Sequence, residues 1–118
     1  MVETLPPIPE RPKGLPDSQT VAIDTWVRVQ PGAIVSREIL RRPTGTVTLF
    51  AFDAGQGLSE HTAPFDALVQ GISGEAQITI AGQPHTVRPG ELLLMPAGQP
   101  HAVLARQPFR MILTMIRS

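Results

Sequence analysis

The sequence predicts an all-β fold of short antiparallel strands, a sandwich or a barrel, in one domain. Three observations support this prediction. Runs rich in β-branched and apolar residues recur along most of the chain, and glycine or proline interrupts them at short intervals. Strict alternation marks Ala76, Ile78 and Ile80, which have polar residues between them. No stretch has the length and the periodicity of an amphipathic helix.

Length and composition exclude several classes of protein. A chain of 118 residues suits one domain and excludes a second catalytic domain. The absence of cysteine excludes disulfides and thiolate nucleophiles and is compatible with the cytoplasm, where we predict the protein to be. Ten basic and ten acidic residues balance, and only Arg41 and Arg42 are adjacent arginines, which argues against nucleic-acid binding. No apolar run has the length of a membrane span, so no membrane partner is expected.

The chain divides into a proline-rich N-terminal arm, residues 1–20, and a single domain, residues 21–118. Five of the first sixteen residues are proline, which blocks helices and central strands and predicts an extended arm on the surface. The run "VAIDTWVRV" at 21–29 is predicted to be a strand, because its β-branched content outweighs a helical alternative. Arm and strand are expected to add to the sheet of a second copy, giving a homodimer with Trp26 near the interface.

The remaining runs predict the other strands in chain order. Two of them, "ELLLM" and "MILTMI", are apolar on both faces, which is typical of strands buried on both sides. The runs are "AIVSREIL" at 33–40, "TVTLFAF" at 46–52, "ALVQGI" at 67–72, "AQITIAG" at 76–82, "HTVRPG" at 85–90, "ELLLMP" at 91–96, "HAVLA" at 101–105 and "FRMILTMI" at 109–116.

The pentapeptide "AGQPH" occurs twice, ending at His85 and at His101. The first copy lies between two strand runs and is interpreted as a hairpin loop, so His85 is assigned no chemistry. The second copy follows a glycine turn and a short apolar run. There Pro96 and Gly98 are expected to reverse the chain and to place His101 at the start of the returning strand.

The stretch "PGELLLMPAGQPH" resembles the second motif of the cupin family, G-x5-P-x-G-x2-H-x3-N. The match runs from Gly90 to His101, and Ala105 stands where the family usually has asparagine. The resemblance implies that the side chain of His101 faces the interior of a barrel.

The upstream stretch "GQGLSEHTAPFDALVQGISG" resembles the first cupin motif, G-x5-H-x-H-x3-E-x6-G. Every spacer is kept from Gly55 through His61 to Gly74. The resemblance covers about residues 45–117. It implies a small single-domain cupin, a double-stranded β-helix or jelly-roll barrel, with an extended N-terminal arm.

The resemblance also implies a metal site that has lost half of its ligands. In metal-binding cupins the two motifs supply three histidines and a glutamate, and here these positions are His61, Ala63, Ala67 and His101. Two imidazoles hold one divalent transition metal, Fe, Ni, Zn or Mn, only if water, substrate or another side chain completes the shell. Two alternatives stay open: metal-free binding of a small molecule, and histidines that are relics hydrogen-bonded to each other or to water.

Alanines in place of two ligands are expected to open an apolar pocket that suits a small, weakly charged organic molecule. Alternation from His61 turns Glu60, Thr62 and Asp66 away from this pocket, whereas Gln70 is expected to turn inward through a bulge. With Ala63, Ala67 and Gln70, the expected lining is Phe50 or Phe52, Phe65, Met95, and Met111 or Leu113.

Three functions follow from these features. The first is a small stand-alone enzyme, in which His61 or His101 binds a metal or acts as a general base. The absence of tyrosine and of a nearby carboxylate argues against the acid and base of cupin sugar epimerases. The second is a metal-free small-molecule binding or sensing module, which needs a partner protein to pass on its signal. The third is a largely structural dimer.

Overall fold

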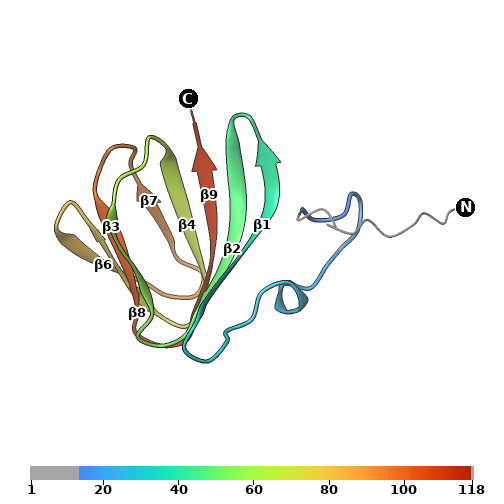
Figure 1. Cartoon of the computed structure of the whole chain (residues 1–118), viewed down its shortest axis with the longest axis horizontal. Coiled ribbons are helices and arrows are strands. Elements are labelled where there is room, and N and C mark those ends of the chain that lie inside the picture. The colour runs from blue at the N-terminus through green and yellow to red at the C-terminus, as the bar shows by residue number, and fades with distance from the viewer. Residues whose placement is uncertain (1–13, 118) are drawn as a thin grey trace, which may run out of the picture.

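The computed structural model describes residues 14–117 and consists of two β-sheets that face each other (Figure 1). A short 3-10 helix, η1 (Ile23–Thr25), precedes nine strands. The strands are β1 (Ile34–Arg42), β2 (Gly45–Phe52), β3 (Gly57–His61), β4 (Asp66–Ser73), β5 (Ala76–Ile80), β6 (Gln83–Val87), β7 (Leu92–Met95), β8 (His101–Ala105) and β9 (Phe109–Ile116).

The order of the strands is that of a jelly roll. One sheet has the order β1-β2-β9-β4-β7 and the other β3-β8-β5-β6, with antiparallel pairing throughout. Figure 1 shows the sheets close together at one end and apart at the end where the C-terminus lies. The predicted jelly roll is confirmed, although over residues 14–117 the sheets stay separate and do not close into one barrel.

The core fills the space between the sheets. Phe52 of β2 and Phe109 of β9 have no exposed surface, and their ring centroids lie 6.0 Å apart. Ile78 and Val103 close the core from the four-stranded sheet. Because side chains alternate along a strand, the same strands leave a second set of side chains on the outer faces of the molecule.

The strand predicted at 21–29 is wrong. This segment holds only η1 and irregular backbone, and it covers the outer face of the five-stranded sheet, where Val27 packs against Leu49 and Ala51. Burial of that apolar face outweighs the β propensity of the segment, which pairs with no strand here. Trp26 lies under the Arg37 guanidinium of its own chain, 4.0 Å from the ring centroid.

Most of the predicted arm lies outside the described residues, which begin at position 14. The described part runs beside β1, where the Leu15 N–H donates to the Ile39 carbonyl at 2.9 Å. Among residues 14–117, no helix is both long enough and apolar enough to cross a membrane.

The first copy of the pentapeptide is a hairpin turn, as predicted. Ile80 pairs with Gln83, and the two residues between them have positive φ, 49° at Ala81 and 83° at Gly82. Positive φ at both central residues is the mark of a type I′ turn, which suits the twist of a hairpin. The Ala81 N–H donates to the Pro100 carbonyl at 2.8 Å, so the first copy lies against the second.

Candidate functional site

The two histidines of the cupin-like motifs meet across a pair of strands. His61 ends β3 and His101 begins β8, and the register places them opposite each other. Their Nε2 atoms lie 3.1 Å apart, and the ring planes meet at 68° with centroids 4.3 Å apart. His101 is buried, with 6% of its surface exposed, whereas His61 is open to solvent. The ring of His101 is therefore enclosed by the protein, and the ring of His61 lies at the surface.

A bulge in β3 brings His61 to this position. Leu58 pairs with Val103 and His61 pairs with His101, so three steps along β3 match two steps along β8. Without the extra residue, Leu58 and His61 would point to opposite faces of the sheet. With it, Leu58 packs against the core while the ring of His61 lies beside that of His101.

Backbone carbonyls fix the orientation of both rings. The Nδ1 atom of His61 lies 2.9 Å from the Ser59 carbonyl oxygen, and that of His101 lies 3.1 Å from the Gln99 carbonyl oxygen. A carbonyl oxygen only accepts hydrogen bonds, so each Nδ1 carries the proton and donates. In the neutral state, both Nε2 atoms therefore present a lone pair, and the two lone pairs face each other.

Two lone pairs at 3.1 Å repel each other unless a cation lies between them. A proton shared by the two rings satisfies this geometry, and so does a metal ion. Zinc binds histidine nitrogen at about 2.0–2.1 Å with tetrahedral angles, which places two such nitrogens about 3.3 Å apart. The observed separation fits two adjacent ligands of one metal.

Among the described residues, the histidines have no third protein ligand. Within residues 14–117, no group of three or more His, Cys, Asp or Glu side chains is arranged to hold a metal. No carboxylate of this part of the chain lies within 4.0 Å of either imidazole, so the rings are oriented by the carbonyls of Ser59 and Gln99 and by each other. A bound metal would keep positions for water or for a small molecule.

The alanines at the other two ligand positions lie in different environments. Ala67 is 2% exposed and lies on β4 between Met95 of β7 and Met115 of β9. Ala63 is half-buried in the loop after β3, and its carbonyl accepts a hydrogen bond from the Gly98 N–H at 2.9 Å. That bond ties the loop after His61 to the loop before His101.

Several residues expected to line a pocket are packed in the core instead. Phe52, Met95 and Met111 are buried in the cluster between the sheets, and Phe50 packs against it. The volume left by the alanines is therefore bordered by packed side chains. Phe65 differs, because it lines a pocket at the open end of the sheets.

Gln70 lies on the face opposite to the core. It pairs with Leu92, which is 64% exposed, and with Ile112, which packs in the outer cluster. The bulge in β4 follows at Gly71 to Ser73, too late to turn Gln70 inward. The structure therefore does not bring Gln70 to the histidine pair.

Sequence reasoning missed the residues that organise the site. The carbonyls of Ser59 and Gln99, each two positions before a histidine, leave no signal in the side-chain pattern. Asp66 was expected to point away, and its carboxylate accepts a hydrogen bond from the Ala97 N–H at 2.9 Å, in the loop before His101.

Comparison with known proteins agrees with this architecture. The sequence profile of a family described as "Cupin domain" matches residues 48–116. A conserved protein of unknown function from Streptococcus pyogenes is 31% identical, with a TM-score of 0.84 over 89% of this chain and 92% of that one. A cupin superfamily protein from Desulfitobacterium hafniense is 25% identical, with a TM-score of 0.82 over 92% of this chain and 99% of that one.

No curated protein matches the sequence. The family profile nevertheless covers more than half of the chain, including both histidines. Together with the jelly-roll order of the strands, this match shows that the chain belongs to the cupin family.

Proposed function

We propose that the protein is a small metal-dependent cupin enzyme that holds one divalent transition metal through the Nε2 atoms of His61 and His101. The observation that carries this proposal is the convergence of two Nε2 lone pairs at 3.1 Å, with each Nδ1 atom at a backbone carbonyl. Iron, nickel, zinc and manganese all accept imidazole nitrogen. A small organic molecule would complete the coordination shell.

The chain's own residues would hold and orient these groups. The carbonyls of Ser59 and Gln99 favour the neutral tautomer that carries its proton on Nδ1, which leaves the Nε2 lone pair of each ring for a metal. The burial of His101 anchors one ligand, and the exposure of His61 leaves access from solvent. A metal held with open positions supplies Lewis acidity toward a carbonyl or phosphoryl oxygen.

Titration of the purified protein with Zn²⁺ and Ni²⁺ in a calorimeter tests the proposal. We expect one metal per chain, and affinity that falls at least about tenfold in His61→Ala and in His101→Ala, because each variant removes one of two ligands. His85→Ala is the matched control, since His85 is exposed on β6 and should leave the affinity unchanged. Equal binding by all four proteins would contradict the proposal.

The second candidate is a metal-free binding or sensing module. It is favoured by the absence of a third ligand among the described residues and by the fact that a shared proton also satisfies the histidine pair. A protein that takes up no metal in the titration, but whose melting temperature rises with one class of metabolite, would be this module.

The predicted homodimer and the cytoplasmic location remain proposals. The outer face of the five-stranded sheet supports pairing of two copies, because Leu92, Leu94 and Ile116 are 64%, 55% and 58% exposed there. The absence of cysteine from the sequence supports a reducing compartment.

A further inference from the structure

The pocket that Phe65 lines lies at the same open end of the sheets as the histidine pair. It has a volume of about 180 Å³, and its walls include Arg41, Thr46, Phe65, Met115 and Arg117. The loop that carries Phe65 directly follows β3, and Figure 1 shows this loop, the β1–β2 hairpin and the end of β9 at one end of the molecule.

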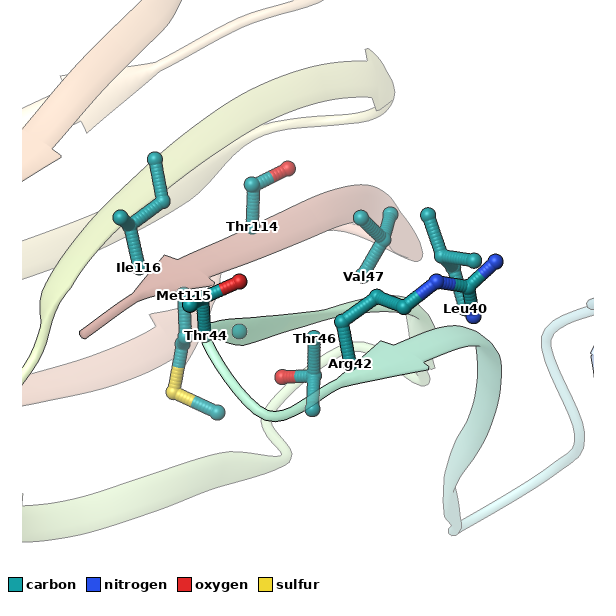
Figure 2. A pocket seen from close by; sticks show the side chains of 9 residues that line it. Leu40, Arg42, Thr44, Thr46, Val47, Thr114, Met115 and Ile116 are labelled. Atoms are coloured by element: carbon teal, nitrogen blue, oxygen red, sulfur yellow. The ribbon is translucent and has the colours of Figure 1, made fainter.

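The strand register places this pocket at the inner face of the five-stranded sheet. Arg41 pairs with Thr46, and Thr46 pairs with Met115, whose side chain packs against the core. Figure 2 shows Thr46 and Met115 on one side of the sheet and Val47 and Thr114 on the other. The same view shows a neighbouring groove, whose walls include Leu40, Val47 and Ile116. Arg42, Gly45, Thr46 and Met115 line both the groove and the pocket.

Three guanidinium groups line the pocket, those of Arg41, Arg42 and Arg117. Arg41 donates through Nε and Nη2 to the carboxylate of Glu38, at 2.9 and 2.7 Å, which holds its side chain in place. Those hydrogen bonds and the charge of Glu38 raise the pKa of Arg41. The guanidinium of Arg117 lies 4.7 Å from the ring centroid of Phe65, and no carboxylate of the described residues lies within 4.0 Å of it.

A buried hydroxyl group completes the polar side of the pocket. Oγ1 of Thr46 is shielded from solvent and has no hydrogen-bond partner within residues 14–117. A buried hydroxyl without a partner is costly, and native proteins nearly always satisfy it. Thr46 itself lines the pocket, so an acceptor group bound there would be a partner for this hydroxyl.

We propose that this pocket binds the anionic group, a carboxylate or a phosphate, of a small molecule. Guanidinium groups match the paired oxygens of both anions, and the Thr46 hydroxyl donates a further hydrogen bond. Phe65 and Met115 would contact the carbon skeleton. This inference goes beyond the metal proposal and does not depend on it, since none of the residues named in the pocket is a histidine.

NMR titration of the ¹⁵N-labelled full chain at low ionic strength tests the inference, with benzoate, its neutral analogue benzamide, and inorganic phosphate as probes. We expect saturable shifts around Thr46, Phe65 and Arg117 with an anion, and binding of benzamide at least about tenfold weaker than that of benzoate. Tighter binding of phosphate identifies a phosphorylated ligand, and tighter binding of benzoate identifies a carboxylate.

Three variants distinguish binding of the anion in this pocket from general electrostatic attraction to the protein. Arg117→Gln and Thr46→Val should each lower the affinity for the anion at least about fivefold. Arg88→Gln, which removes an equal charge beside Glu75, should change that affinity by less than about twofold. Thr46→Val should also raise the melting temperature of the free protein, because it removes an unpaired buried hydroxyl.

The inference is overturned if neither anion gives saturable shifts at these residues up to about 50 mM. It is equally overturned if Arg117→Gln and Thr46→Val bind as the wild type does, or if Arg88→Gln weakens binding as much as they do.

Discussion

The double variant Ala63→His with Ala67→Glu is expected to bind Zn²⁺ or Ni²⁺ at least about 100-fold more tightly than the wild type. The two positions are those at which the cupin motifs supply a second histidine and a carboxylate. Ala63 lies in the loop tied to Gly98, just before His101, and Ala67 lies on the inner face of β4. Two added donors, one of them negatively charged, would complete a four-ligand set with His61 and His101.

The same variant is expected to be less stable without metal. Ala67 is 2% exposed, and a carboxylate buried there without a partner costs several kcal/mol, which metal binding would recover. The matched control is Ala63→His with Ala76→Glu, since Ala76 is equally buried but lies on β5 outside the motif. Calorimetry and thermal unfolding with and without Zn²⁺ measure both effects. Unchanged affinity in the double variant would mean that the four positions do not converge.

Gly74→Ala is expected to lower the free energy of unfolding by about 3–5 kcal/mol. Gly74 has φ of 75°, and a Cβ atom there would lie far closer to the carbonyl oxygen of Pro108 than the 3.0 Å that real Cβ atoms keep. The obstacle is backbone, so it cannot move aside as a flexible side chain would. Urea unfolding monitored by circular dichroism measures the loss.

Gly55→Ala is the matched control for Gly74→Ala. Gly55 also has a positive φ, 84°, but a Cβ atom there would meet nothing within 4 Å. Only the backbone strain remains, so the expected loss is about 1–2 kcal/mol. Equal losses in the two variants would show that the close approach of Pro108 does not explain the glycine that ends the first cupin motif.

The sequence predicted most strands because local patterns report them directly. Alternation at Ala76 to Ile80 and the apolar run of β9 both correspond to strands. It did not predict β3, since "GLSEH" contains no β-branched residue and is held as a strand by its pairing with β8. It also assigned 21–29 to a strand, because propensity does not show that an apolar sheet face is available for the segment to cover.

The sequence also predicted only part of the candidate site. Motif spacing brought attention to His61 and His101, which the structure places side by side. The bulge that turns His61 inward depends on the register between β3 and β8, which no local pattern records. Gln70 stays on the outer face because the bulge in β4 follows it, between Gly71 and Ser73. The pocket of Arg41 and Arg117 joins residues about 76 positions apart, which only the sheet topology brings together.

Long-range ¹H–¹⁵N correlation spectra of the histidine rings, recorded with and without Zn²⁺, test whether His61 and His101 bind one metal through Nε2. With Zn²⁺, we expect His61 and His101 both to carry their proton on Nδ1 and both Nε2 resonances to shift. His85 should not change. A proton on Nε2 of either ring in the presence of Zn²⁺, or spectra of both rings that Zn²⁺ leaves unaltered, would contradict a metal site formed by His61 and His101.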